Sequence, residues 1–362
     1  MSPQAPSPIP PGQARGRGAR SNASGRFETQ RHEAFDDGWP ADEAPAPLRT
    51  TLTAEQARTL ISRNDSPDVP FDQSINPYRG CEHGCIYCYA RPAHAYMGLS
   101  PGLDFESRLF FKPQAGARLA EELAHPRYTP KVIHIGGNTD PYQPAEKRLE
   151  VTRGVIATLW EFRHPFSIIT KNALILRDLD LLAPAAWANL TRVAISVTTL
   201  DRSLARAMEP RAATPERRLL AVRRLAEAGV PATVMFAPVI PGLNDHEMEA
   251  VLERAAEAGA VGAGYVMLRL PREIETLFTE WLESARPDRA RRVLSLIRQM
   301  RGGRANDPRF GHRMRGDGPL ADLVARRFAL ACARLGLDRG RTPLDLSQFR
   351  PKARAPQGDL FG

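Results

Sequence analysis

The chain of 362 residues contains no run of about 18 or more apolar residues, so we expect no transmembrane segment. Its N-terminal region lacks the apolar stretch of a secretory signal, and we therefore expect a cytoplasmic protein. Only four cysteines occur, too few to build a disulfide scaffold in a chain of this length. Three of them fall within eight residues, which in a reducing compartment indicates a metal site.

Lysine is also scarce, since it occurs at five positions whereas arginine occurs at 45. The formal net charge is +9, and a basic surface is compatible with nucleic-acid binding. An arginine-rich composition with a basic tail would give the same charge without such a partner. The charge alone therefore does not select a class of partner.

Composition divides the chain into four parts. Residues 1–48 are rich in proline, alanine, glycine and arginine without apolar periodicity, which predicts a disordered basic arm. Within it, the stretch Ser21–Trp39 carries aromatic residues that could dock on the body. We expect the core in residues 49–275, a helical C-terminal extension in 276–341 and a flexible tail in 342–362.

Between the two ends, apolar and β-branched runs alternate with helical patterns. The predicted strands are Ser74–Tyr78, Lys131–Ile135, Phe166–Thr170, Val193–Thr198, Ala232–Phe236 and Tyr265–Leu270. Thr214 and Pro215 begin one helix that Gly229 ends, and Asn244 with Glu247 resembles a capping box for another. Six such units predict an α/β protein with a partial, TIM-like (β/α)6 barrel. Its chemistry should lie at the carboxyl ends of the strands.

The clustered cysteines are Cys81, Cys85 and Cys88, with the spacing C-x3-C-x2-C and Tyr87 just before the last. Iron–sulfur clusters prefer thiolate ligands, and a cubane normally takes four of them. Three thiolates on one loop would hold three irons of a [4Fe–4S] cluster and leave the fourth open. An open coordination position allows an exogenous ligand to bind.

A structural zinc site is the alternative for this loop, with His83 or His94 as the fourth ligand. Zinc sites favour separated C-x2-C pairs over a single trio, which argues against this alternative. The remaining cysteine, Cys332, lies in a helical pattern, and we expect it to be buried in the core.

The trio and its preceding aromatic residue resemble the signature of the radical S-adenosylmethionine (SAM) superfamily. The similarity covers roughly residues 71–275 and is greatest to the spore photoproduct lyase branch, including a bacterial group often labelled photolyase-like. The resemblance implies an enzyme that binds a [4Fe–4S] cluster and SAM and cleaves SAM reductively to a 5′-deoxyadenosyl radical. It also implies an electron donor such as flavodoxin or ferredoxin.

The resemblance further implies SAM contacts at the ends of the second and third strands. Gly136, Gly137 and Asn138 follow the second strand, and the two glycines would approach the methionyl amine closely. Lys171 follows the third strand and would meet the SAM carboxylate as a point charge. A glycine-rich turn and a solvent-exposed loop lysine are the structural alternatives.

Later strands add further candidates of the same kind. Ser196 and Thr198 share one face of the fourth strand and would hydrogen-bond the ribose or carboxylate, unless the backbone satisfies them. Arg211 would clamp the carboxylate. Arg269 lies in an apolar strand and should face the cavity, since a buried unpaired charge is unfavourable. The loop Val239–Asp245 resembles the adenine-side loop of the superfamily.

The resemblance suggests a DNA photoproduct as substrate, with one departure. In the lyase, a cysteine after the second strand supplies a hydrogen atom, and Asn138 occupies that position here. An amide cannot play this part, so lyase chemistry would require Cys332, Tyr89 or Tyr142 to replace the cysteine. The sequence assigns no catalytic residue.

The tail residues Gln357–Phe361 resemble the short motif that docks on bacterial sliding clamps, although such short motifs also recur by chance. Three hypotheses remain open. The leading one is a radical SAM enzyme acting on DNA or RNA, such as a damaged or modified base. The others are a radical SAM enzyme acting on a peptide, protein or metabolite, and a non-catalytic iron–sulfur or zinc protein.

Overall fold

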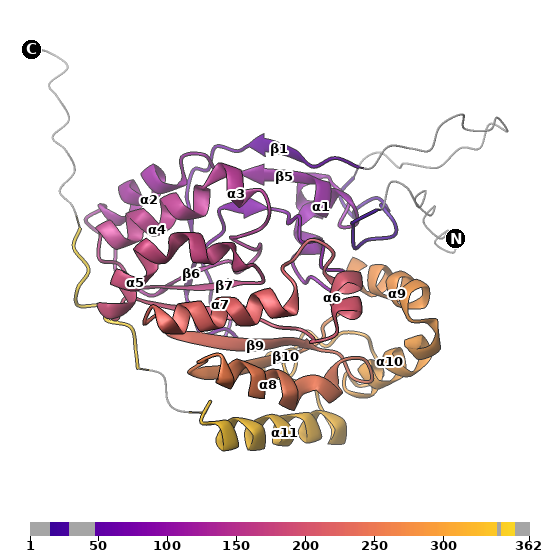
Figure 1. The fold of residues 1–362 in the computed structure, drawn as a ribbon. Coiled ribbons are helices and arrows are strands. Elements are labelled where there is room, and N and C mark those ends of the chain that lie inside the picture. Colours follow the sequence, from indigo (N-terminus) through magenta and orange to yellow (C-terminus); the bar gives the residue numbers. More distant parts are fainter. Residues whose placement is uncertain (1–14, 29–47, 339–341, 352–362) are drawn as a thin grey trace, which may run out of the picture.

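The computed structural model of the chain describes residues 15–28, 48–338 and 342–351. Seven strands form one sheet in the order β10-β9-β8-β7-β6-β3-β2 (Figure 1). Their bounds are β2 Ile61–Arg63, β3 Gln73–Ile75, β6 Ile133–Ile135, β7 Phe166–Thr170, β8 Thr191–Ser196, β9 Ala232–Val239 and β10 Gly262–Met267. All neighbours are parallel except the antiparallel edge pair β2 and β3. The predicted α/β partial barrel is confirmed.

The helices lie along one face of the sheet, where alternate strand residues are fully buried (Figure 1). These helices are α2 Ala115–Leu123, α4 Val151–Glu161, α5 Leu179–Trp187, α7 Pro215–Glu227 and α8 Met248–Glu257. Ile135, Ile168 and Val193 stand side by side in register and pack beneath them. The hydrophobic core therefore sits between sheet and helices, and the other face of the sheet is left to line the barrel interior.

Of the six predicted strands only β7 has the predicted bounds, and two of the differences change how the sheet is built. Tyr78–Arg79 does not continue β3 but forms β4, which pairs with β5 (Arg108–Phe111) in a small sheet that also contains β1 (Thr51–Ala54). The last strand begins at Gly262, three residues before the predicted start. Gly264 has low strand propensity, yet it leaves room for Met235, whose sulfur would lie 2.6 Å from an added Cβ.

One predicted helix start is confirmed and the other is wrong. The Thr214 hydroxyl accepts a hydrogen bond from the backbone N–H of Arg217, and α7 begins at Pro215. Asn244 does not cap α8, because its amide is buried in the loop after β9. There it accepts from the N–H of Ile240 at 2.6 Å and donates to the carbonyl of Thr198 at 2.7 Å.

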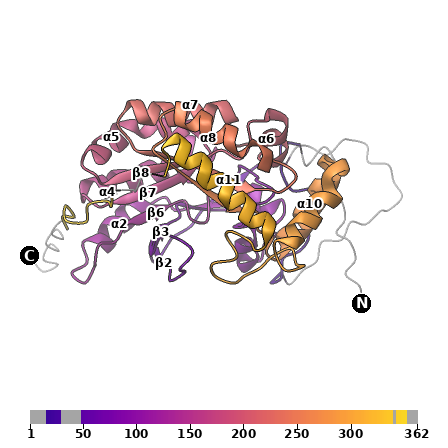
Figure 2. The same cartoon turned by 90° about the horizontal axis from the view of Figure 1, so that it is seen from below.

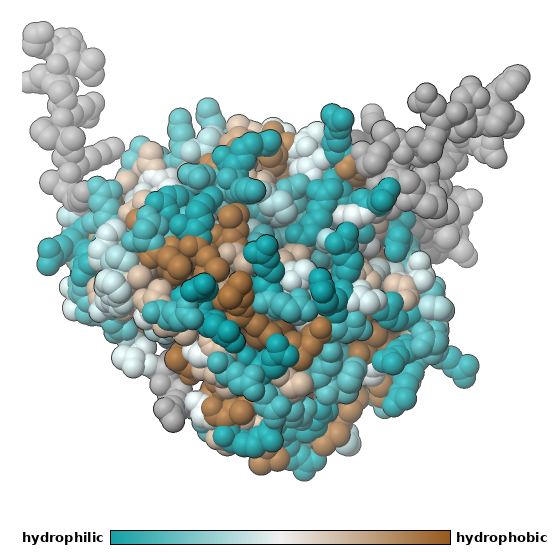
Figure 3. Space-filling view, viewed as in Figure 1, coloured by the Kyte–Doolittle hydropathy of each residue, from teal (hydrophilic) through white to brown (hydrophobic). Residues whose placement is uncertain are grey.

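Shorter elements and the C-terminal helices complete the fold. They are η1 Arg91–Met97, α1 Asp104–Ser107, α3 Glu146–Leu149, η2 Ala173–Asp178, α6 Arg202–Met208, η3 Asp245–Glu247, α9 Glu273–Ala285, α10 Pro287–Gln299 and α11 Pro319–Leu335. Helix α11 crosses α8 (Figure 2), and its Cys332 is buried in the main core as expected. No helix in the described ranges is long and apolar enough to cross a membrane. Figure 3 shows a mainly hydrophilic face with a narrow, broken apolar band across it.

Two stretches that the sequence assigned to unstructured ends lie on the body. Within residues 15–28, Arg17 and Ala19 are buried. The Ala19 N–H donates to the buried carboxylate of Glu106, and the Arg17 guanidinium donates to the backbone carbonyl of the same residue. Within residues 342–351, the ring of Phe349 packs against those of Tyr128 and His164. Both stretches therefore contact the body of the protein. The rest of the predicted arm and the Gln357–Phe361 motif lie outside the described residues.

Candidate functional site

The three cysteines lie on one loop between β4 and η1, at the edge of the sheet where the parallel strands end. Cys81 and Cys85 are buried and Cys88 is partly buried. The loop turns at Gly80 and Gly84, which both have positive φ. At Gly80 only a glycine fits, since an added Cβ would lie 2.8 Å from the carbonyl oxygen of Phe105.

Burial and neighbouring groups raise the pKa of the cysteine thiols. Burial raises the pKa of Cys81 well above its ordinary value, and Asp140 and the thiols of Cys85 and Cys88 raise it further. A backbone hydrogen bond from His83 opposes this shift. Buried thiolates of this kind need a nearby positive charge, which the irons of a cluster provide. The cysteine loop therefore fits an iron–sulfur cluster.

The two histidines of the zinc alternative contact other groups. In the part of the chain that the structure describes, no three histidine, cysteine or carboxylate side chains converge as a single metal ion requires. His83 instead lies 3.3 Å from a carboxylate oxygen of Asp140, and His94 bonds the carbonyl of Arg108 at 3.0 Å. A cluster requires no such convergence, because each thiolate binds a different iron.

Three of the predicted SAM contacts meet beside the cysteine loop. The Lys171 ammonium donates to the hydroxyl of Ser196 at 2.6 Å and lies 3.3 Å from that of Thr198. It also lies 3.3 Å from a carboxylate oxygen of Glu209, to which Thr198 donates at 2.7 Å. Tyr87 of the cysteine loop donates to the same carboxylate. Residues at the carboxyl ends of β7 and β8 thus form one polar network with the cysteine loop.

Glu209 is the centre of this network, and it was not predicted from the sequence. We call the group the Glu209 network; its members are Tyr87, Lys171, Ser196, Thr198, Glu209 and Arg218. It is buried and forms an ion pair with Arg218, which is buried as well. Burial alone would raise the pKa of Glu209, but Arg218 and then Lys171 hold it below its ordinary value. Two positive charges therefore face one negative charge. The only signal in the sequence was a glutamate after the fourth predicted strand, two residues before the candidate Arg211.

The glycine-rich stretch after β6 approaches the same loop from another side. Gly136 has a φ of 98°, and an added Cβ would lie 2.7 Å from Pro141 and 2.9 Å from the carbonyl of Ile169. The carbonyl of Gly137 accepts a hydrogen bond from the hydroxyl of Tyr89, which follows Cys88. Asn138 is exposed, and its backbone N–H donates to Asn76.

The two candidate arginines lie in different places. Arg211 donates to a carboxylate oxygen of Glu82 and to the carbonyl of Gly16, both at 3.1 Å, so the structure does not bring it to Lys171. Arg269 lies over the ring of Tyr89, 5.8 Å from its centroid. It forms no ion pair within the described ranges, and its guanidinium donates to the sulfur of Met314 at 3.5 Å. Arg269 therefore lies beside the exposed ring of Tyr89 as a cation. We call this side of the cysteine loop the mouth of the site.

The inner face of the sheet beneath this mouth is polar and aromatic. Ser74, His134 and Ser167 stand in register on β3, β6 and β7. His134 bonds Ser167 at 3.0 Å and stacks on Phe71 at a ring distance of 4.4 Å. Burial lowers the pKa of His134 to about 4, so the imidazole is neutral at pH 7. This lining was not predicted from the sequence, because Phe71 lies in the connection between β2 and β3.

The segment 301–318 spans the open side of the barrel. The carbonyl of Met314 accepts from the N–H of Met267 at 2.9 Å, so the segment extends the β10 edge. At the opposite edge, Arg313 forms an ion pair at 2.5 Å with Asp68 in the loop after β2. Arg313 also lies over the exposed ring of Phe310. The mouth of the site is thus bounded by arginines and exposed aromatic rings.

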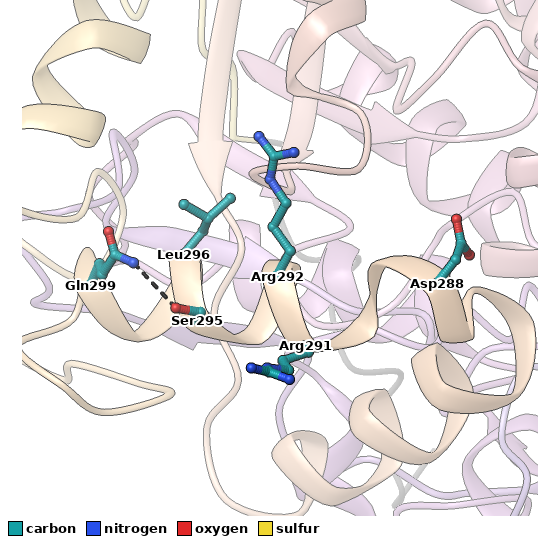
Figure 4. A pocket seen from close by; sticks show the side chains of 6 residues that line it. All are labelled: Asp288, Arg291, Arg292, Ser295, Leu296 and Gln299. Carbon is teal, nitrogen blue, oxygen red and sulfur yellow. Dashed lines mark hydrogen bonds between the residues drawn. The ribbon is translucent and has the colours of Figure 1, made fainter.

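A groove on α10 is a separate feature (Figure 4). Its volume is about 400 Å³ and its lining residues are Asp288, Arg291, Arg292, Ser295, Leu296 and Gln299. It contains no cysteine and none of the residues of the Glu209 network. We therefore place the functional site at the cysteine loop rather than at this groove.

Comparisons with known proteins agree with this geometry. The family model of the radical SAM superfamily matches residues 75–255. An uncharacterized protein of Mycobacterium tuberculosis is 38% identical over 259 residues, covering 70% of this chain and 76% of its own. An uncharacterized protein of Methanocaldococcus jannaschii is 28% identical over 173 residues, covering 48% of this chain and 62% of its own.

Solved structures of spore photoproduct lyase share the fold. One mutant superposes with a TM-score of 0.57 at 16% identity, covering 79% of this chain and 80% of that chain. Another mutant, with bound AdoMet and dinucleoside spore photoproduct, superposes with a TM-score of 0.56 at 15% identity, covering 78% and 79%. Family match, shared fold and the cysteine loop together show that the chain belongs to the radical SAM superfamily.

Proposed function

We propose that the protein cleaves SAM reductively at a [4Fe–4S] cluster held by Cys81, Cys85 and Cys88. The observation that carries this proposal is the placement of the four cysteines. Three share one loop beside the Glu209 network, and Cys332 is buried in α11 on the core side of the sheet. A cubane on this loop has no fourth thiolate, so one iron stays open to SAM, and the bound cluster would supply the electron for cleavage.

The residues around the loop have the charges that SAM requires. Lys171 and Arg218 carry two positive charges against the single carboxylate of Glu209, so the network has a surplus positive charge. An incoming carboxylate on Lys171 would neutralise that surplus, with the hydroxyls of Ser196 and Thr198 alongside. At Gly137 an added Cβ would have no neighbour closer than 3.7 Å, so the methionyl amine could approach the backbone there.

Exposure supports one of the three residues that could replace the lyase cysteine as hydrogen-atom donor. Cys332 is buried in α11, and Tyr142 is fully buried with its hydroxyl bonded to Asp178. Tyr89 is 53% exposed, lies next to Cys88 and sits below Arg269. We propose Tyr89 as the tyrosine that meets the substrate.

SAM cleavage is tested with anaerobically reconstituted protein, dithionite and SAM. We expect 5′-deoxyadenosine and methionine to form, because the loop, Lys171 and the glycine-rich stretch supply the positions that SAM needs. Chromatography with mass detection measures both products, and heat-denatured protein is the control. A fully iron-loaded sample that makes neither product would contradict the proposal.

For the substrate, we favour nucleic acid over a peptide or a metabolite. Arg269 and Arg313 stand at the mouth together with the exposed rings of Tyr89 and Phe310. Arginines follow a phosphate backbone and aromatic rings stack on unpaired bases, so this combination suits a single-stranded or flipped base. The neutral His134 and Phe71 below could accommodate a planar ring.

Arg269→Gln should lower the salt dependence of nucleic-acid binding. If Arg269 contacts one phosphate, the slope of log affinity against log salt for a short single strand falls by about 1. Fluorescence anisotropy at several salt concentrations measures the slope. Arg334→Gln removes one charge from α11, where Arg334 pairs with Glu253, and should leave the slope unchanged. Equal slopes in both variants, or no binding, would favour a peptide or metabolite substrate.

Two partners are proposed from the sequence. A flavodoxin or ferredoxin would reduce the protein in the cell, and replacing dithionite by such a donor in the cleavage assay tests this. The Gln357–Phe361 motif would bind a sliding clamp. Deleting residues 357–362 should abolish clamp binding, and unchanged binding would exclude the motif.

A further inference from the structure

We infer that residues 17–19 form a clasp that closes the outer side of the cysteine loop and holds its conformation. The clasp appears in Figure 1 as part of the indigo loop beside α1. Arg17 is 4% exposed and Ala19 is fully buried, although they belong to the basic region that the sequence predicts to be disordered. Burial of a polar backbone here requires specific partners.

One carboxylate supplies those partners. The N–H groups of Gly18 and Ala19 each donate to an oxygen of Glu106 at 2.8 Å. The Arg17 guanidinium donates to the backbone carbonyl of Glu106 at 2.5 Å and to that of Leu48 at 2.8 Å. Glu106 is fully buried, so these bonds are shielded from water.

The same carboxylate holds the cysteine loop from inside. Glu106 forms an ion pair with Arg91 at 2.5 Å, and both side chains are fully buried. Arg91 donates in turn to the carbonyl of Cys85 at 2.9 Å and to that of Gly84 at 3.1 Å. Clasp and loop are therefore joined through the pair formed by Arg91 and Glu106. Removing the clasp takes two hydrogen bonds away from this buried carboxylate.

The clasp also touches the loop directly. A Cβ added to Gly18 would lie 1.9 Å from the carbonyl oxygen of Gly84, between the first two cysteines. Ala19 belongs to the same apolar cluster as Cys85. Beyond the clasp, Ser21 bonds Glu280 at 2.7 Å, which ties the segment to α9. The clasp thus covers Gly84 and Cys85, and its release would open this side of the loop.

The test compares Arg17→Ala and Gly18→Ala with Arg20→Ala in the full-length protein. Arg20 is exposed and adjacent to the clasp, so its variant is a matched control. In iron-free protein, Cys81, Cys85 and Cys88 should react with a small maleimide about tenfold faster in both clasp variants, because the loop opens locally more often. Mass spectrometry assigns the label, and Cys332 reports any global loosening.

A second measurement uses reconstituted protein in air. The clasp variants should lose iron about tenfold faster than the Arg20→Ala control, followed with a coloured chelator. Faster labelling confined to the three loop cysteines supports the clasp. Rates equal to the control, or an equal rise at Cys332, would overturn it. The inference rests on the proposed cluster loop, but thiol labelling without iron fails or succeeds independently of SAM cleavage.

Discussion

Replacing Cys81, Cys85 or Cys88 singly with alanine is expected to remove the bound iron and reduce 5′-deoxyadenosine formation to background. Each thiolate would bind a different iron, so the chain has no spare ligand. The only other cysteine, Cys332, is held in α11 within the core and cannot reach the loop. Iron and sulfide analysis after anaerobic reconstitution, together with product yield, measures the effect.

Cys332→Ala is the matched control for these variants, because it removes a buried thiol of the same kind at a different place. It should bind iron as the wild type does. If Cys332→Ala also lost iron, or if one of the three loop variants retained a full cluster, the assignment of the ligands would be wrong. Circular dichroism of every variant separates loss of the cluster from loss of the fold.

Glu209→Gln is expected to destabilise the iron-free protein by about 3–5 kcal/mol, the usual effect of removing one partner from a buried ion pair. Arg218 would be left buried without its carboxylate, and Lys171, Tyr87 and Thr198 would lose a shared partner. Urea unfolding monitored by circular dichroism measures the change. The variant should also bind SAM more weakly, since Lys171 would no longer be held in place.

Glu253→Gln provides the comparison, because Glu253 pairs with Arg334 on the surface, with side-chain exposures of 43% and 60%. Exposed pairs contribute about 0–1 kcal/mol, so this variant should unfold close to the wild type. If Glu209→Gln were equally mild, Glu209 would not be the centre of the network. The ion pairs of Glu209 with Arg218 and Lys171 would then contribute little to the stability of the protein.

The sequence predicted the elements whose signals are local. Strand β7 has the predicted bounds, and α7 begins where Thr214 and Pro215 indicated. The cysteine spacing is a local signal too, because ligands to one cluster can lie close together in the chain. Where one side chain meets distant partners, prediction failed. Asn244 was interpreted as a helix cap, whereas tertiary contacts use its amide to fix the loop after β9.

The centre of the site could not be predicted, since its members come from distant segments. Glu209 acquires its importance only when folding brings Lys171, Tyr87 and Arg218 around it. Residues 17–19 were assigned to a disordered arm by composition, which carries no information about the buried Glu106 that binds them. The role of a buried charged residue depends on partners that are distant in the sequence, so it can be recognised only in the folded chain.

The open iron is the central claim, and electron paramagnetic resonance of the reduced, reconstituted protein tests it most directly. We predict about four irons per chain and a [4Fe–4S] signal that changes when SAM is added, because SAM binds the iron that lacks a thiolate. A full cluster whose signal is identical with and without SAM, or an iron content far below four, would contradict the account.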